Sequence, residues 1–306
     1  MIKVRLPLPP NFSFDAVVRS HGWYDLPPFE YDREKGELRT VIEVPPLPPG
    51  EGRGEGRPQA DRASSVMFRG RKGRLEAISE NLAPNELRNA ARRVFSLDLD
   101  LDPFAAALAG EPLVTRALSR RGGRILRAPT LFEDAVKILF TTNCSWAATR
   151  GMVTRLIAEA GVDARAFPSA RRVARLTVRT LKKKVRCGYR AEALAQFARR
   201  LASGRLDLSA WERLDRPAEE IRAEILAERG FGPYAAEGLL RILGRHDFLA
   251  LDSWTRQKYR QLHPGPARST DRAIARRYAR FGAFRGLALW LELTEDWHAA
   301  EERVWP

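Results

Sequence analysis

The sequence predicts an α+β protein: an N-terminal α/β domain built on an antiparallel sheet, followed by an all-α domain. Two observations carry this prediction. Short runs of β-prone residues fall within the first hundred or so positions, and from about Pro103 onward the apolar residues recur with helical spacing. A chain of 306 residues is long enough for two such domains. We place the boundary near residue 110, so that the predicted domains are residues 1–110 and 111–306.

The first two predicted strands are residues 3–6 and 38–44, where β-prone side chains alternate or follow one another. Between them, the polar segment Tyr31–Glu37 contains a glycine and directly precedes the second strand. Polar residues with a glycine beside a β-prone run are typical of a hairpin turn. The sequence therefore predicts a β-hairpin near the N-terminus.

The segment at about residues 45–62 is rich in Pro and Gly and predicts a surface loop or linker, because it has too little apolar surface to order itself. Residues 66–68 are expected to resume the sheet. Residues 85–95 have helical spacing, with Leu87 and Ala91 on one face, and predict a helix in this domain.

The second domain is predicted to be a bundle of helices joined by short turns. Leu131, Ala135 and Ile138 form one apolar stripe at helical spacing, and Gly161 is a stop signal after the following helix. The apolar pattern predicts helices over residues 131–139, 146–157, 190–201, 221–226, 235–243, 274–281 and 287–293.

The charge balance favours a polyanionic partner without proving one. The formal net charge is +15, and 45 of the 53 basic residues are Arg. Such an excess suits contacts to phosphate groups, but a GC-rich genome also enriches Arg codons. The composition therefore allows nucleic acid binding and does not decide it.

Several classes of protein are excluded by what the sequence lacks. Two cysteines are too few for a disulfide scaffold, and no CxxC pair is available for zinc or an iron–sulfur cluster. The histidines show no metal-binding spacing, so neither a metal nor a cofactor is expected. No run of about 18 apolar residues occurs, and the N-terminal residues lack the apolar stretch of a signal peptide. We expect a cytoplasmic protein that does not span a membrane.

The segment Gly230-Phe231-Gly232 is the first candidate functional motif. One predicted helix ends there, and the next begins at once with Pro233 in its first turn. Two glycines around one apolar residue allow a tight turn that leaves backbone N–H groups uncovered, and such amides can bind a phosphate. Phe231 is expected to point inward and hold the two helices together. The alternative is an ordinary turn between helices.

Asp252 is the second candidate. It follows the apolar run that ends at Leu251 and precedes a new helix. Aspartate at such a position is either a helix N-cap or a fixed functional carboxylate. The two roles are compatible, because nearby amides hold a capping carboxylate in place and keep it ionised.

Taken together, these motifs resemble the helix–hairpin–helix DNA glycosylase superfamily, and the resemblance covers most of the chain. It rests on the Gly-x-Gly-Pro hairpin followed by an aspartate. It also rests on further similar segments in the same order, several of them closest to the 3-methyladenine DNA glycosylase II branch, at residues 11–14, 93–98, 139–146, 187–191, 276–288 and 293–297.

The resemblance implies a role for each candidate residue. Asp252 corresponds to the catalytic carboxylate, the hairpin Gly230-Phe231-Gly232 to the part that binds the DNA backbone, and Asn143 to the residue that fills the gap left by a flipped base. Aromatic side chains are expected to hold that base. The candidates for this pocket are Tyr234, Trp254 and Trp290, with Trp23 and Trp146 ranked below them.

Two departures from the superfamily narrow the implied activity. The branch that also cleaves the DNA strand has a lysine where this chain has Tyr234, and a tyrosine cannot form the Schiff base which that reaction needs. The endonuclease III branch carries a four-cysteine cluster, for which this sequence has no ligands. The resemblance therefore implies a monofunctional DNA glycosylase that removes alkylated purines such as 3-methyladenine and has no lyase activity.

Two alternatives stay open. The lesion could be 8-oxoguanine or a deaminated base, which Asn143 and the turn Gly188–Ala191 slightly favour, or the chain could be a DNA-binding relative without catalysis. In each case the expected partner is double-stranded DNA, and the resemblance implies a monomer. Basic runs at residues 171–175, 182–186, 199–200 and 276–277 are candidates for phosphate contacts.

Overall fold

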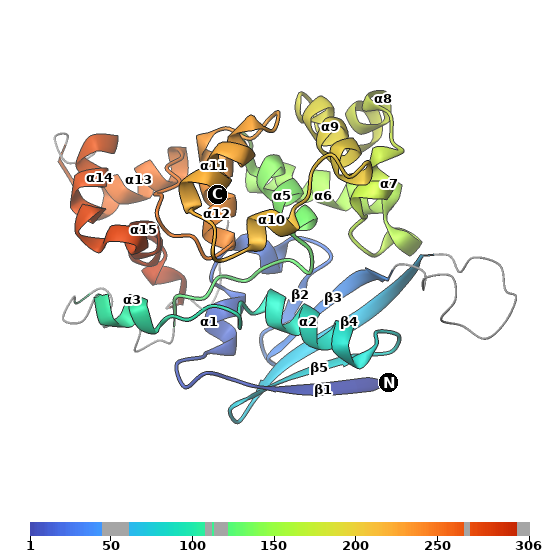
Figure 1. Ribbon diagram of the computed structural model, residues 1–306, viewed down its shortest axis with the longest axis horizontal. Coiled ribbons are helices and arrows are strands. Elements are labelled where there is room, and N and C mark those ends of the chain that lie inside the picture. Colours follow the sequence, from blue (N-terminus) through green and yellow to red (C-terminus); the bar gives the residue numbers. More distant parts are fainter. Residues whose placement is uncertain (45–60, 108–111, 113–121, 266–269, 299–306) are drawn as a thin grey trace, which may run out of the picture.

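The computed structural model describes residues 1–44, 61–107, 112, 122–265 and 270–298 (Figure 1). Nearly all of the predicted loop at about 45–62 lies outside these residues, as does the predicted domain boundary near residue 110. Arg62, at the end of the predicted loop, is described, and it opens a strand instead. The α+β prediction is confirmed, because an antiparallel sheet and many helices are both present.

All strands of the sheet come from the first 80 residues and pair antiparallel in the order β1-β5-β4-β3-β2. The predicted strands at 3–6, 38–44 and 66–68 are all found. Two strands were not predicted, one before the turn and one after β4. The strands are β1 (Ile2–Pro7), β2 (Glu30–Asp32), β3 (Glu37–Val44), β4 (Arg62–Arg71) and β5 (Arg74–Ser79).

The predicted hairpin exists, but its first strand is β2 and lies partly inside the segment predicted as a turn. Tyr31 pairs with Leu38 there, while β1 pairs with β5 at the other side of the sheet. The pairing follows from burial: Leu38 lies opposite Phe68 of β4, and both are fully buried on the face that packs against helices.

Two helices cover the buried face of the sheet, α1 (Phe14–Val18) and α2 (Pro84–Val94). α2 contacts β1 and β5. Its predicted apolar face is confirmed, since Leu87 and Ala91 are fully buried. Phe95 follows α2 and lies between the rings of Phe14 at 5.1 Å and Phe68 at 5.3 Å. These ring contacts fix α1 and α2 on one sheet face.

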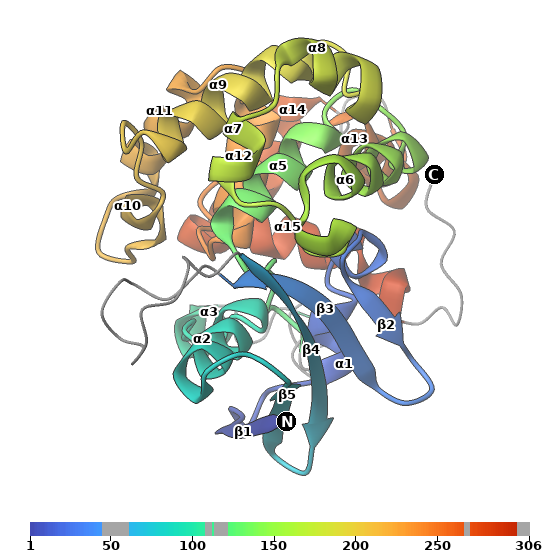
Figure 2. The same cartoon turned by 90° about the vertical axis from the view of Figure 1, so that its right-hand side faces the viewer.

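The remaining described chain is largely helical and, except for the helix Asp102–Ala107, which lies at the level of α2, it lies above the sheet in Figures 1 and 2. Its longer helices are α3 (Asp102–Ala107), α5 (Leu131–Thr141), α6 (Trp146–Ala160), α7 (Ala170–Ala174), α9 (Arg190–Ala202), α11 (Ala218–Ala227), α12 (Pro233–Ile242), α13 (Ser253–Leu262), α14 (Asp271–Tyr278) and α15 (Arg285–Leu293). Shorter helices are α8 (Val178–Thr180) and α10 (Ser209–Glu212).

The predicted helices are all present, with one difference in length. The helix predicted over 274–281 ends at Tyr278 and continues as a 3-10 segment, Ala279–Phe284. Gly282 has a φ of +53° inside that segment, a backbone conformation that interrupts an α-helix. Because of this break, α15 starts in a new direction.

One continuous apolar core joins the sheet to the helical part. It contains Phe68 and Leu75 from the sheet, Leu139 of α5 and Leu239 of α12. A second cluster lies among α3, α13, α14 and α15. The two parts therefore share buried surface, and the sheet is a support for the helices above it.

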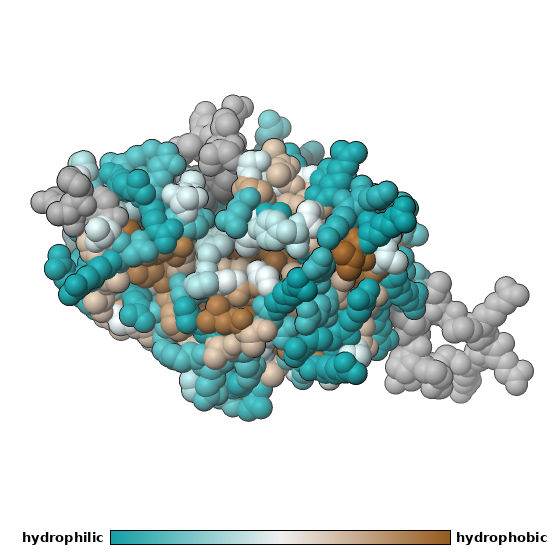
Figure 3. Space-filling model, turned by 90° about the horizontal axis from the view of Figure 1, so that it is seen from above, coloured by the Kyte–Doolittle hydropathy of each residue, from teal (hydrophilic) through white to brown (hydrophobic). Residues whose placement is uncertain are grey.

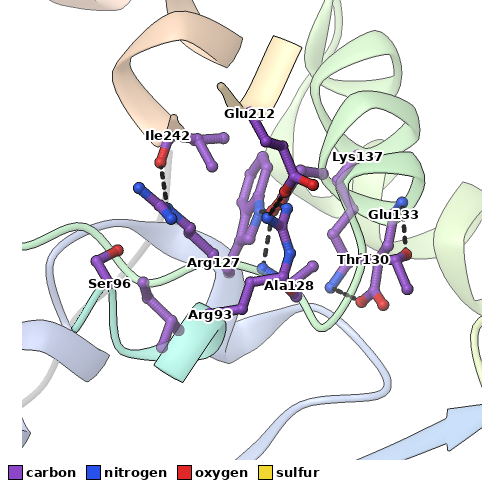
Figure 4. Close-up of polar contacts among 12 residues, drawn as sticks. Arg93, Ser96, Arg127, Ala128, Thr130, Glu133, Lys137, Glu212 and Ile242 are labelled. Atoms are coloured by element: carbon purple, nitrogen blue, oxygen red, sulfur yellow. Dashed lines mark hydrogen bonds and ion pairs between the residues drawn. The ribbon is translucent and has the colours of Figure 1, made fainter. Parts of the chain in front are cut away.

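Buried polar groups reinforce this junction (Figure 4). The carboxylate of Asp134 on α5 is fully buried and accepts three hydrogen bonds, from Trp23 Nε1 at 2.8 Å, from Ala128 N at 2.8 Å and from Arg93 Nη2 at 2.7 Å. Beside it, the buried Lys137 pairs with Glu133 at 2.6 Å. A buried carboxylate with three donors is held firmly, because each donor replaces hydration that burial removed.

We expect Asp134→Ala to lower the free energy of unfolding by about 3–5 kcal/mol, since it leaves two buried N–H groups without their acceptor and removes the buried carboxylate partner of the Arg93 guanidinium. Urea denaturation followed by circular dichroism measures this. The control is Glu212→Ala, which removes the exposed second carboxylate on Arg93 and should cost less than about 1 kcal/mol. Equal losses of unfolding free energy in the two variants would contradict the conclusion that Asp134 is the carboxylate that stabilises this junction.

Candidate active site

A cavity of about 190 Å³ lies where α5, α6, α12, α13 and α15 meet the loop that follows α1. Four residues singled out from the sequence line it: Asp252, Tyr234, Trp254 and Trp290. They come from positions up to 56 residues apart along the chain, so the tertiary fold brings them together. Figure 3 looks down on the helical part, where hydrophilic side chains border a hollowed strip of paler and brown residues.

Asp252 is both a helix cap and a cavity residue. Its Oδ1 accepts the backbone N–H of Thr255 at 2.7 Å, and Thr255 Oγ1 accepts the backbone N–H of Asp252 at 2.7 Å, which together cap α13. No hydrogen bond to Oδ2 is found in the described part of the chain. The carboxylate is thus fixed in orientation by one oxygen and leaves the other for the cavity.

Tyr234 lies in the first turn of α12 and turns its hydroxyl toward α5, where Thr141 Oγ1 is 3.4 Å away. Burial raises the pKa of Tyr234, and the negative charge of Asp252 raises it further. The phenol therefore stays protonated at neutral pH and is a neutral hydrogen-bonding group, beside a carboxylate, in an apolar site.

Three tryptophans form one wall of the cavity. The ring centroids of Trp254 and Trp290 are 5.9 Å apart, and Trp297 lies 5.3 Å from the first and 5.5 Å from the second. The indole N–H of Trp290 is donated to Ser20 O at 2.9 Å. Trp297 was not predicted, because an aromatic residue near the end of the chain carries no signal of this contact.

The sequence ranked Trp23 and Trp146 below the other aromatics, yet both line the cavity, which corrects that ranking. Trp23 donates its N–H to Asp134, and Trp146 donates to Asp25 Oδ2 at 2.7 Å. Gly22 makes room for Trp146, since a Cβ there would lie 2.3 Å from the indole ring. The indole nitrogens are satisfied elsewhere, so these rings offer the cavity apolar surface.

Arg241 also lines the cavity and was missed by the sequence analysis. Its side chain is nine-tenths buried, donates Nη2 to Leu249 O at 3.1 Å and lies over the ring of Trp290 at 4.3 Å. The sequence did contain one indication that Arg241 is unusual: it is an arginine among the apolar residues of α12, where Leu239, Leu240 and Ile242 are all buried.

The hairpin between α11 and α12 has the predicted shape. Gly230 has a φ of +89°, and a Cβ on it would lie 2.7 Å from Ala193 Cβ, so only glycine fits without strain. Gly232 has an extended backbone and open space where a Cβ would stand. Gly232, the N-cap of α12, makes no side-chain capping bond, and Pro233 has no N–H, so the amides that the described residues leave to a ligand in the first turn are those of Tyr234 and Ala235.

Phe231 points inward, as predicted, and is only 2% exposed. Its ring lies 5.1 Å from that of Phe197, and its N–H is donated to Glu228 O at 3.1 Å. That Phe231 contacts DNA stays a prediction, and in this structure its side chain is buried and its amide is donated within the chain. Phe231 sets the shape of the hairpin.

Asn143 is exposed just after α5, with a φ of +47°. Its amide nitrogen donates to the hydroxyl of Tyr189, 3.3 Å away, and the guanidinium of Arg190 lies over the Tyr189 ring. Tyr189 is 61% exposed, which is unusual for so large an apolar ring. The sequence placed Tyr189 in a motif but did not predict its position beside Asn143.

The basic runs differ in how available they are. Several of their charges are already ion-paired, as in Lys182–Glu192, Lys184–Glu159, Arg200–Glu228 and Arg277–Glu292. Lys183 and Arg186 are exposed and form no ion pair with any described residue. Arg171, Arg175 and Arg276 are likewise exposed and without an ion pair to any described residue, so several charges of these runs are available for an anionic ligand, and Lys183 and Arg186 are close in sequence to Tyr189.

Two further classes of site were searched for in the described residues. They contain no cluster of three or more His, Cys, Asp or Glu side chains that could hold a metal ion. They also contain no helix long and apolar enough to cross a membrane.

The fold is similar to that of solved DNA glycosylases. The 8-oxoguanine glycosylase/lyase of Clostridium acetobutylicum, in its apo form, superposes with a TM-score of 0.69 at 18% identity, over 95% of each chain. The 3-methyladenine DNA glycosylase of Archaeoglobus fulgidus gives 0.68 at 20% identity, over 95% of this chain and 98% of that one.

A third structure, of the Clostridium acetobutylicum enzyme in complex with double-stranded DNA containing cytosine opposite 8-oxoguanine, gives a TM-score of 0.67 at 17% identity, over 94% of this chain and 93% of that one. No protein-family model matches the sequence, and no curated protein matches it. The resemblance inferred from the sequence is thus confirmed at the level of the fold.

The two hairpin glycines should respond differently to substitution by alanine. Gly230→Ala should lower the free energy of unfolding by about 1–3 kcal/mol, because it combines a left-handed backbone with a close Cβ contact. Gly232→Ala should leave it within about 0.5 kcal/mol. Urea denaturation of both variants measures this, and a larger loss at Gly232 would overturn the description of the hairpin.

Proposed function

We propose that this protein is a monofunctional DNA glycosylase that hydrolyses the N-glycosidic bond of a damaged purine in double-stranded DNA. The observation that carries the proposal is Asp252, a carboxylate fixed by the cap of α13 with one oxygen left for an aromatic-walled cavity. The fold shared with solved DNA glycosylases supports the same conclusion.

A base inside a duplex is out of reach, so the nucleotide must be rotated out of the stack into a pocket. The cavity suits such a base, because Trp146, Trp254 and Trp290 present ring surface to it while their indole nitrogens or neighbouring rings hold them in place. Asn143 and the adjacent Tyr189 are exposed side chains that can occupy the gap left in the duplex.

The reaction follows from where charge develops. As the C1′–N bond lengthens, its electron pair leaves with the base and positive charge grows on the sugar. The Asp252 carboxylate stabilises that cation and takes a proton from the attacking water, whose oxygen forms the new bond to C1′. A cationic alkylated base leaves as a neutral molecule, and the proton taken from the water passes to solvent; a neutral purine leaves as an anion and takes up that proton. An abasic site remains in either case.

Tyr234 supports a reaction that stops at this point. A strand-cleaving lyase needs a neutral amine to form a Schiff base with C1′, and a phenol cannot form one. Tyr234 stands at the position that the resemblance assigns to that amine. Water is therefore the nucleophile in the proposed mechanism, and the DNA backbone stays intact.

Binding to the DNA backbone would come from the hairpin and nearby charges. The uncapped amides at the start of α12 and the helix dipole favour a phosphate group. Gly232 leaves open space there, so a phosphate can approach closely. Lys183 and Arg186 would increase the affinity for DNA and make it depend on salt concentration. Such phosphate contacts do not distinguish one damaged base from another.

Two substrate classes fit the cavity. Alkylated purines such as 3-methyladenine carry a positive charge, and the tryptophan wall can hold such a base through its electron-rich ring faces. The second candidate, 8-oxoguanine or a deaminated purine, is favoured by a different observation: Arg241 brings a positive charge and hydrogen-bond donors into the same lining.

We expect Asp252→Asn to keep DNA binding and to slow base excision by at least about 10³-fold, since it removes the charge that stabilises the sugar cation. Asparagine also caps helices well, so α13 should stay folded. Single-turnover excision and gel-shift binding measure the two effects. The control is Asp271→Asn, a carboxylate of the neighbouring α14 outside the cavity lining. Near wild-type excision by Asp252→Asn would rule out this mechanism.

We expect borohydride to trap no covalent adduct between the wild-type enzyme and lesion-containing DNA, because no amine stands at the Tyr234 position. The abasic product should stay unbroken until alkali is added. Denaturing gels resolve both outcomes. Efficient trapping, or strand breaks that appear without alkali, would show a lyase.

A further inference from the structure

Arg241 is the cavity residue that the proposed mechanism leaves without a role. It stands on α12, and its side chain is 9% exposed. Its Nη2 donates to Leu249 O at 3.1 Å, and its guanidinium lies over Trp290 at 4.3 Å. Its Nε is buried and has no hydrogen-bond partner among the residues that the structure describes. A guanidinium has five N–H donors in a planar fork, so most of this group's capacity is unused.

No carboxylate within the described residues forms an ion pair with Arg241. The nearest acidic side chain on the same helix, Glu237, pairs with Arg222 at 2.8 Å and accepts the N–H of Ala250 at 2.9 Å. Asp252 uses one oxygen for the helix cap. Burying a charge without a partner is costly, and proteins seldom do so unless a ligand completes the site.

The guanidinium keeps its charge despite this environment. Burial lowers the pKa of Arg241 to about 10, while the negative charges of nearby acidic groups oppose the shift. At neutral pH the cavity wall is therefore positively charged at this point. A base that already carries a positive charge is repelled by Arg241 at this point of the wall, against the attraction of the Asp252 carboxylate in the same lining.

We propose that Arg241 reads the flipped base: it donates hydrogen bonds to a carbonyl oxygen of a neutral purine and disfavours cationic alkylated purines. The proposal rests on the glycosylase function argued above and chooses between its two substrate classes. Deaminated or oxidised purines such as hypoxanthine and 8-oxoguanine are neutral and present carbonyl acceptors.

The other polar groups of the cavity agree with this choice. The hydroxyl of Tyr234 is the donor in its contact with Thr141 Oγ1, because Thr141 uses its own proton elsewhere. Thr141 donates its own hydroxyl proton to Ile138 O at 2.7 Å, and the thiol of Cys144 donates to Phe140 O at 2.9 Å. The protons of Thr141, Cys144 and Tyr234 are thus already donated, which leaves the Arg241 guanidinium as the charged donor of the lining, and a base that lacks acceptors cannot pair with it.

The first experiment compares single-turnover excision from duplexes that contain hypoxanthine, 8-oxoguanine, 7-methylguanine or 3-methyladenine. We expect the wild type to prefer a neutral lesion. Arg241→Met keeps the side chain's length and its contact with Trp290 but removes the charge. It should lower the ratio of the excision rate of neutral lesions to that of cationic lesions at least about tenfold. Losing one hydrogen bond from a charged group has an effect of about this size.

A merely structural role for Arg241 would slow all four reactions alike and leave the ratio unchanged. Two variants serve as controls. Arg222→Met removes another ring-stacked arginine, 5.0 Å from Phe248, which does not line the cavity, and it should not change the ratio. Arg241→Lys keeps the charge and should still disfavour the cationic lesions.

The second experiment separates recognition from catalysis. In an Asp252→Asn background, equilibrium binding of the same duplexes should favour the neutral lesions, and adding Arg241→Met should remove that preference. A preference for cationic lesions in the wild type, or a ratio that Arg241→Met leaves unchanged in both assays, would overturn the inference. Absence of excision from every duplex would instead overturn the glycosylase function. In that case the ratio of the binding affinities for neutral and cationic lesions still decides the role of Arg241.

Discussion

The buried carboxylate of Asp134 is the point on which both halves of the molecule depend. It accepts hydrogen bonds from Trp23 in the loop after α1, from Arg93 of α2 and from the backbone of Ala128. These groups come from the sheet side, the helix that covers the sheet and the segment entering α5. Because Trp23 also lines the cavity, the same contact sets one wall of the candidate active site.

The cavity shows how structural and chemical roles can share residues. Asp252 begins α13 as its cap, and the capping hydrogen bonds hold its carboxylate still, which is what stabilising a developing cation requires. Trp290 is held by Ser20 at its nitrogen and covered by Arg241 on its face. The hairpin also combines two roles. The buried Phe231 holds the turn in shape, and the neighbouring Gly232 leaves open space beside it.

Much of this arrangement could be predicted from residue patterns. Helical spacing located α5, α6, α9, α11, α12 and α15, and the hairpin motif located Gly230 and its left-handed backbone. The pairing of β1 with β5, the strand β2 inside a predicted turn and the cavity positions of Trp23 and Trp146 were missed. These depend on contacts between residues far apart in the sequence, which local patterns do not record.

The sequence by itself determined the fold class, the helical hairpin and a carboxylate at the start of a helix. Local backbone preferences and apolar periodicity act over a few residues, so they can be read without the tertiary structure. Only the tertiary structure decided that Asp252, Tyr234 and the tryptophans share one cavity, and that Arg241 joins them. An arginine in an apolar helix becomes informative once its surroundings show that it forms no ion pair with any carboxylate of the described residues.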